Sequence, residues 1–173
     1  MAVKKLDYDF FHRDAVTVAK ELAGKIVVRK MPDGRLIRIR ITEAEAYCGE
    51  EDKGCHASKG RTPRTELLYG RAGTIYVYLC YGMHWLMNVI TGDEGHPEGV
   101  LLRAGEGFGG PARLTKALGV DKSFNGKSIL DNREIWIEDD GINFEITSAP
   151  RVGIDYAGEE WKNKPWRFIA KLK

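Results

Sequence analysis

Residues 36–47 read LIRIRITEAEAY. Apolar and basic residues alternate over residues 36–41, which is typical of a half-buried β-strand. Side chains two apart on an extended backbone share a face, so Glu43, Glu45 and Tyr47 would lie together if the strand continues through Ala46. A carboxylate beside an aromatic ring suits general-base chemistry on a flat substrate that stacks on the ring. Taken alone, residues 42–47 favour a simpler alternative, in which the strand ends and the chain runs into a solvated acidic turn at residues 50–52.

Two hairpins are predicted on either side of this stretch. The first joins residues 25–30 to residues 35–41 through the turn sequence MPDG. The second joins the β-branched and aromatic residues 75–79 to residues 84–90 through a bend at Tyr81-Gly82-Met83. A polar connection over residues 49–74 separates the hairpins, and connections of such length tend to be functional.

The remaining periodic segments complete a mixed fold. One helix is predicted over residues 15–22, with Asp14 as its N-cap and Gly24 as its C-terminal cap. A second is predicted over residues 111–118, with Pro111 in its first turn and Gly119 as its cap. Residues 99–104 and 134–138 are predicted as strands, and residues 6–13 as an extended lead-in. Because short strands outnumber helices and occur in hairpins, the predicted class is α+β, a single domain over residues 1–173 built on an antiparallel or mixed sheet.

Composition limits the functional classes. The chain is 43% hydrophobic and 30% charged, which is ordinary for a soluble globular protein. No membrane-spanning run and no signal peptide are visible, so we expect a cytoplasmic protein without a membrane partner. The net charge of +2 is too small to imply nucleic acid, but residues 53–76 hold five bases against one acid. That segment is either a phosphate-contacting patch or a solvated loop.

The three cysteines favour reduced thiols in a cytosolic compartment. A zinc site could be assembled on paper from Cys48, Cys55, His56 and Cys80, but their spacing differs from paired CxxC or HxxxH ligands. We therefore expect no metal and no cofactor. Cys80 lies in an apolar run and is predicted to belong to the core.

Two further side chains are ambiguous on the sequence alone. Arg103 ends a short apolar strand, where it either faces a carboxylate or an anion or lies at a solvated sheet edge. Tyr76 and Tyr78 share a strand face, which is more often a core stripe than a binding site.

Together, these segments resemble the mammalian-type alkyladenine (3-methyladenine) DNA glycosylases, a family that also occurs in bacteria. The resemblance covers most of the chain from about Leu22 to Phe168. It rests on the segments ITEAEAYCGEEDKGCHASKGRTPR, GTIYVYLCYGMHWLMN, GVLLRA, GPARLTKALGVDKSF and RVGIDYAGEEWKNKPWRF. It implies a curved antiparallel sheet with flanking helices and a protruding β-hairpin. This sequence departs from the family at His84-Trp85, where relatives often carry other aromatic or apolar residues, so the resemblance does not imply how the hairpin is braced.

The resemblance also implies roles for eight residues. Glu45 is similar to the general base that activates water against C1′ of a flipped nucleotide. Arg103 and the backbone carbonyl of Val152 resemble the groups that help hold this water. The residues that resemble contacts to DNA are Tyr47 and Tyr78 as rings that sandwich the base, His56 on its edge, Asn88 beneath it, and Tyr81 as the minor-groove wedge.

The implied activity is that of a monofunctional DNA glycosylase of base excision repair. Such an enzyme removes alkylated or deaminated purines, such as 3-methyladenine, 7-methylguanine, hypoxanthine and ethenoadenine, and leaves an abasic site. The implied partner is double-stranded DNA containing damaged purines, bound by a monomer. The main alternative is a non-catalytic nucleic-acid binding module, which would use the same basic loop and aromatic residues without needing Glu45.

Overall fold

The long strand β3 (Leu36–Cys48) is the centre of the fold, as the alternating sequence predicts. The computed structural model describes residues 2–173. The other strands are β1 (Lys4–Lys5), β2 (Ile26–Lys30), β4 (Ile75–Cys80), β5 (His84–Thr91), β6 (Glu98–Gly105), β7 (Ile135–Asp139), β8 (Glu145–Ala149) and β9 (Arg167–Lys171). The α-helices are α1 (Tyr8–Phe11), α2 (Ala15–Leu22), α3 (Pro111–Leu118) and α4 (Gly158–Lys162). Short 3₁₀ helices are η1 (His56–Lys59), η2 (Glu66–Tyr69), η3 (Lys122–Phe124) and η4 (Asp155–Ala157).

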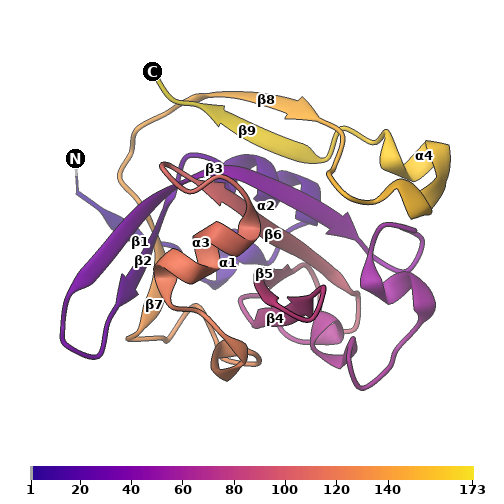
Figure 1. The fold of residues 1–173 in the computed structure, drawn as a ribbon, viewed down its shortest axis with the longest axis horizontal. Coiled ribbons are helices and arrows are strands. Elements are labelled where there is room, and N and C mark those ends of the chain that lie inside the picture. Colours follow the sequence, from indigo (N-terminus) through magenta and orange to yellow (C-terminus); the bar gives the residue numbers. More distant parts are fainter. Residues whose placement is uncertain (1) are drawn as a thin grey trace.

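All strand pairs are antiparallel, and the main order is β1-β7-β2-β3-β6-β5-β4. The first part of β3 pairs with β2, and its second part lies between β6 and β9, with β8 beyond β9. Figure 1 shows β3 crossing the molecule from the β2 hairpin toward the loops near α4. Register shifts against β6 around Glu43 mark a bulge, which bends and twists a strand. The predicted α+β fold with a curved antiparallel sheet is confirmed.

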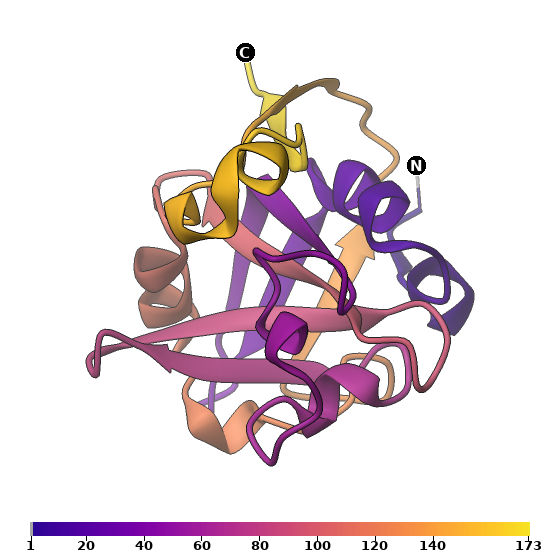
Figure 2. The ribbon, with the colours of Figure 1, turned by 90° about the vertical axis from the view of Figure 1, so that its right-hand side faces the viewer.

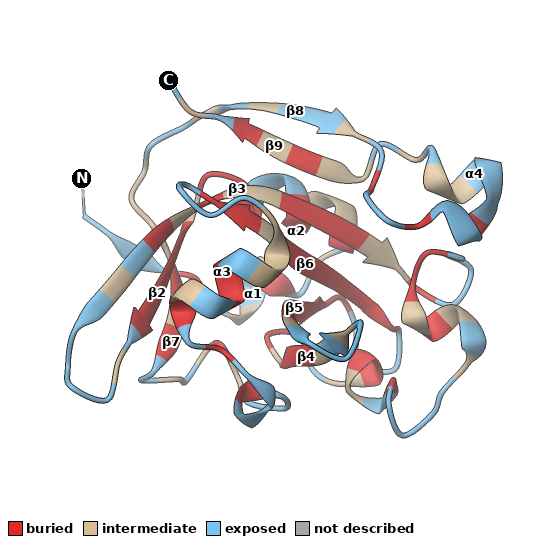
Figure 3. Ribbon diagram, in the orientation of Figure 1, coloured by how far each residue is buried: buried red, intermediate tan, exposed pale blue. Residues whose placement is uncertain are grey.

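Helices α2 and α3 cover opposite faces of this sheet, as Figures 1 and 2 show together. Helix α2 begins where the Asp14 side chain accepts a hydrogen bond from the Thr17 amide, which confirms the predicted cap. Helix α3 ends at Gly119, whose backbone is left-handed. Buried residues concentrate along β3, β5 and β6 between the two helices, whereas β8 is largely exposed (Figure 3).

The second predicted hairpin, β4–β5, protrudes beyond the rest of the molecule in Figure 2. Its base is held by the segment after α3, because the Val77 amide donates to Asn125 Oδ1 at 2.8 Å and the Ile75 amide donates to the Lys127 carbonyl. Trp85 packs against the main core, so part of the His84-Trp85 pair braces the hairpin from inside.

Two local predictions were wrong, those for residues 6–13 and for Cys80, and some short elements were not expected. Residues 6–13 are not simply extended, because Asp7 caps the short helix α1 by accepting from the Phe10 amide. Strand β8 was not expected, and the connection over residues 49–74 contains η1 and η2. Cys80 is partly exposed near the hairpin tip rather than in the core. Among residues 2–173, no helix is long and apolar enough to cross a membrane.

Candidate active site

A cavity of about 490 Å³ opens between β3, the β4–β5 hairpin, β6 and the loops before η1 and η4. The first residues of α3 also contribute to its wall. Every site residue expected from the sequence lines this cavity: Glu45, Tyr47, His56, Tyr78, Tyr81, Asn88, Arg103 and Val152. Segments separated by about a hundred positions along the chain therefore meet in one concave site, of a size typical for small-molecule pockets.

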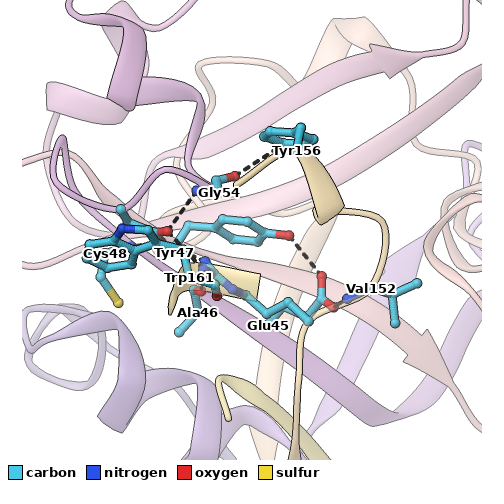
Figure 4. A network of polar contacts seen from close by, with 10 residues as sticks. Glu45, Ala46, Tyr47, Cys48, Gly54, Val152, Tyr156 and Trp161 are labelled. Carbon is cyan, nitrogen blue, oxygen red and sulfur yellow. Dashed lines mark hydrogen bonds and ion pairs between the residues drawn. The ribbon is translucent and has the colours of Figure 1, made fainter. Parts of the chain in front are cut away.

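Glu45 is the carboxylate of this cavity, and its side chain is fully buried. Because β3 stays extended through Cys48, Tyr47 points the same way and its hydroxyl donates to Glu45 Oε1 at 3.0 Å. The backbone amide of Val152 donates to Glu45 Oε2 at 2.7 Å, and Figure 4 shows Tyr47 and Val152 both beside the carboxylate. Arg103 Nε lies 3.7 Å from the same oxygen, so of the two alternatives left open for Arg103 the structure has the one with a carboxylate partner.

Burial raises the pKa of Glu45, while the Val152 amide, Arg103 and the Tyr47 hydroxyl oppose that rise. A carboxylate with a raised pKa is a stronger base than a glutamate in water. Burial, followed by the charge of Glu45, holds the pKa of Tyr47 well above its usual value. Tyr47 therefore keeps its proton and acts as a donor to Glu45.

Aromatic rings form much of the remaining wall. The His56 and Tyr78 rings lie edge to face with centroids 4.5 Å apart, and the Tyr76 and Tyr78 rings lie 5.5 Å apart. Nδ1 of His56 lies 3.0 Å from the Tyr76 hydroxyl. Burial, Arg64 and Lys59 lower the pKa of His56 to about 4, so its ring is neutral near pH 7. The sequence left open whether Tyr76 and Tyr78 belong to the core or to a binding site, and the structure shows both uses. Tyr76 belongs to a small buried cluster, and both tyrosines line the cavity.

The hairpin tip carries Tyr81, whose side chain is 88% exposed. Its φ of +53° makes it the one non-glycine residue with a left-handed backbone among residues 2–173. Left-handed geometry costs a tyrosine on the order of 1 kcal/mol, and such strain is concentrated at functional positions. The neighbouring Met83 is also well exposed, so the tip presents apolar surface to solvent.

Asn88 lies on β5, opposite Tyr76 of β4, and is buried. Its side-chain nitrogen donates to the Tyr76 carbonyl at 3.2 Å, so it bonds to backbone and lines the cavity at once. Glu43, by contrast, was expected on the Glu45 face but is not among the cavity-lining residues. Glu43 and Glu45 pair in unbroken register with Ile169 and Arg167 of β9, and the Glu43 carboxylate forms an ion pair with Arg167 at 3.3 Å instead of lining the cavity.

Sequence reasoning missed a buried ion pair beside the cavity. Asp52 was expected in a solvated turn, but Asp52 and Arg151 are both fully buried, and Arg151 Nη1 lies 2.6 Å from Asp52 Oδ2. The one signal for Arg151 is its place directly before Val152-Gly153-Ile154, since a charge in an apolar segment needs a partner. Tyr156 was also missed; it stands at the cavity rim, and its hydroxyl donates to the Gly54 carbonyl at 3.1 Å (Figure 4).

The residues considered for zinc do not form a ligand set. No three or more His, Cys, Asp or Glu side chains in the part of the chain that the structure describes are grouped to hold a metal ion. Burial raises the pKa of Cys48, and it raises that of Cys55 to about 11, so both remain thiols near neutral pH.

Comparison with known proteins agrees with this geometry. A family model described as methylpurine-DNA glycosylase (MPG) matches residues 9–109 and 107–173. A protein of Natranaerobius thermophilus named "Putative 3-methyladenine DNA glycosylase" is 44% identical over 191 aligned residues, covering 96% of each chain. Proteins with the same name from Methanocella arvoryzae and Desulfitobacterium hafniense are each 40% identical, covering 96% of this chain and 92% and 95% of their own. The chain therefore belongs to the methylpurine-DNA glycosylase family.

Proposed function

We propose that this protein is a monofunctional DNA glycosylase that removes alkylated or deaminated purines from double-stranded DNA. In this proposal a damaged purine nucleotide is flipped into the cavity, and a water activated by Glu45 hydrolyses the bond between base and sugar. The products are a free base and an abasic site in an uncut strand.

The observation that carries the proposal is the position of Glu45. It is a fully buried carboxylate at the wall of an aromatic cavity, with one donor on Oε1 and donors on Oε2 from two other segments. Each oxygen has two lone pairs, so the carboxylate can still accept a proton from water. A fixed base of this kind contributes about 10²–10⁴-fold to a rate. Its negative charge would also stabilise the positive charge that develops on the sugar.

The other groups have roles that follow from their surroundings. A base cannot be attacked inside a duplex, so it must leave the stack, and the exposed Tyr81 at the hairpin tip is suited to fill the gap. We assign Tyr47 and Tyr78 to stacking on the base and His56 to its edge. Cationic methylated purines would gain a cation–π attraction from these rings. Arg103 and the Val152 carbonyl are assigned to holding the water.

The mechanism needs no covalent intermediate. None of the described residues that line the cavity is a lysine, so no amine there is placed to form a Schiff base with the sugar. This supports a monofunctional enzyme. The proposed hydrolysis also involves only Glu45, water and the substrate, without a cofactor.

Duplex oligonucleotides carrying hypoxanthine, ethenoadenine, 3-methyladenine or 7-methylguanine test the proposal. The wild-type protein is incubated with each in EDTA, followed by alkaline cleavage of abasic sites and, in parallel, by no alkali. We expect cleavage only after alkali, and a loss of about a hundredfold or more for Glu45→Gln with lesion binding retained. Binding without excision by the wild type would instead identify a nucleic-acid binding module, and near-normal turnover by Glu45→Gln would remove Glu45 from the mechanism.

A further inference from the structure

We propose that the buried Asp52–Arg151 ion pair positions the Glu45 carboxylate for catalysis, by holding Val152 against it and by supporting Tyr47 from behind. This inference rests on the proposed function, because it assigns both residues to the hydrolysis at Glu45. Neither residue lines the cavity, so both are positioning residues rather than catalytic ones.

The Asp52–Arg151 ion pair is bidentate, and both side chains are fully buried. Arg151 Nη1 lies 2.6 Å from Asp52 Oδ2 and Nη2 lies 2.8 Å from Oδ1, and neither side chain is exposed. Two parallel bonds of this kind define the orientation of both groups as well as their distance.

Both partners bind backbone that belongs to the site. Asp52 accepts hydrogen bonds from the Cys48 and Gly54 amides, each at 2.9 Å, which ties the end of β3 to the loop before His56. Arg151 Nη1 donates at 3.0 Å to the carbonyl of Ala46, the residue between Glu45 and Tyr47. Its Nη2 donates to the Trp161 carbonyl at 3.2 Å near the end of α4. Figure 4 shows Ala46, Cys48, Gly54 and Trp161 gathered at this point.

The guanidinium also supports the Tyr47 ring. Its Cζ lies 4.8 Å from the centroid of the Tyr47 ring and 5.0 Å from that of Trp166. A ring held against a fixed cation loses freedom to turn, so the hydroxyl that donates to Glu45 is held in place together with the ring.

The next residue after Arg151 delivers the second donor. The Val152 amide donates to Glu45 Oε2 at 2.7 Å, although the Val152 side chain and the following Gly153 are exposed. Pro150, the residue before Arg151, is also held, because Arg167 Nε donates to its carbonyl at 2.8 Å. The position of the Val152 amide is therefore determined mainly by anchors in the two residues before it, and Arg151 is the buried one.

Energetics argue against a purely stabilising role. Burying an ion pair costs so much desolvation that apolar residues of similar volume often stabilise a protein equally well or better. Arg151 Nε adds to that cost, since it is buried without a hydrogen-bond partner among the described residues. By this argument the pair adds little net stability, yet it joins the end of β3, the loop before η1 and the end of α4 beside Glu45, which is better explained by positioning.

Loss of the pair should therefore change how Glu45 titrates. The groups that face Glu45 are Tyr47 from β3, Tyr78 from β4, Arg103 from β6, and Arg151, the Val152 amide and Tyr156 from the C-terminal loops. Displacing the Val152 amide and removing the Arg151 charge would leave the carboxylate with fewer stabilising partners. Its protonation would then occur at higher pH, and the acidic limb of the excision rate would move with it.

The test measures single-turnover excision of hypoxanthine from a duplex between pH 5 and 8.5 with the full chain. The variants are Asp52→Asn, Arg151→Lys and the apolar double variant Asp52→Leu with Arg151→Met, which is expected to fold because no unpaired charge remains. The control is Asp140→Asn, which breaks another bidentate pair, with Arg40, at 3.0 and 2.7 Å and away from the cavity. Thermal melts establish that each variant is folded.

We expect the folded Asp52 and Arg151 variants to lose about tenfold to a hundredfold at pH 7, as displacement of a catalytic group by about 1 Å would cause. The acidic limb of the double variant, which loses both the Arg151 charge and its hold on the Val152 amide, should lie at higher pH than that of wild type, while Asp140→Asn keeps the wild-type rate and profile. A folded double variant with an unshifted profile, whether fast or slow, would overturn the inference while leaving the glycosylase function standing. A wild-type protein that excises no base would instead refute the function itself.

Discussion

Replacing Glu45 by glutamine should raise the thermal stability of the protein while abolishing its activity. Burial raises the folded-state pKa of Glu45 above the value of an unfolded glutamate, so the protonated form favours the fold. This contribution to the free energy of unfolding is present below the unfolded pKa and is lost as pH rises through the folded pKa. At neutral pH the ionised Glu45 is therefore a net cost, and glutamine removes it.

The site can accommodate glutamine. The glutamine side-chain oxygen can accept a hydrogen bond from the Val152 amide, which can only donate. The glutamine NH₂ group can donate to the Tyr47 hydroxyl, because a hydroxyl can accept as well as donate. Each pKa unit by which Glu45 is raised corresponds to about 1.4 kcal/mol of unfolding free energy. For a domain of this size, 1 kcal/mol corresponds to about 2–4 °C in Tm. The gain at pH 7 should thus be on the order of 3–5 °C for each unit.

Thermal melts of wild type and Glu45→Gln at pH 7 and at pH 4 measure this difference. The Tm gain should be present at pH 7 and should shrink toward zero at pH 4, where Glu45 in the wild type is protonated. Glu43→Gln is the matched control, because Glu43 is two residues away, half-buried and paired with Arg167. It should change stability by at most about 1 kcal/mol, and in the destabilising direction. A Glu45→Gln protein that melts below wild type at pH 7 would show that the three donors outweigh burial, contrary to this reasoning.

Two further predictions concern residues that contact DNA in the proposed complex. Tyr81→Ala should weaken base flipping by about a few kcal/mol, seen as slower single-turnover excision, because the vacated stack stays unfilled. The Tm of Tyr81→Ala should barely change, because the Tyr81 side chain is exposed, or should rise slightly, because alanine relieves part of the strain of the left-handed φ. A large drop in Tm would make Tyr81 a structural residue. Asn88→Ser should increase the rate of excision of guanine mispaired with thymine relative to the rate for hypoxanthine. Guanine carries an exocyclic 2-amino group that hypoxanthine lacks, and the shorter serine side chain leaves room for it in the pocket. An unchanged ratio with lower overall activity would mean that the bond from Asn88 to Tyr76 is its main role.

Features set by local periodicity could be predicted from the sequence. The alternation over residues 36–41, continued through Ala46, places Glu45 beside Tyr47, and a carboxylate partner was one of the two alternatives for Arg103, which lies near Glu45. Strand β8 has an exposed and polar sequence, so no hydrophobic pattern marks it. The bulge at Glu43 depends on how β3 pairs with β6, and residue spacing within β3 contains no information about that pairing.

Features set by distant partners could not be predicted in the same way. Asp52 stands in a run of acids whose composition is that of a solvated turn, and only Arg151, 99 positions later, makes its burial possible. The roles assigned to the eight cavity residues came from the family resemblance, and the structure adds that all eight meet in one cavity. Their individual contributions to catalysis stay predictions until the variants are measured.

The 107 positions between Glu45 and Val152 also have a consequence for biosynthesis. The strands that carry Glu45, Tyr78 and Arg103 leave the ribosome well before residues 151 and 152 do. Until then Asp52 has no cation to pair with, and the carboxylate lacks its backbone donor. Contacts of such long range form late in folding, because a large loop must close first. A growing chain can therefore form the walls of the cavity before it can complete the site, so the reactive centre is assembled only after residues 151 and 152 have been made.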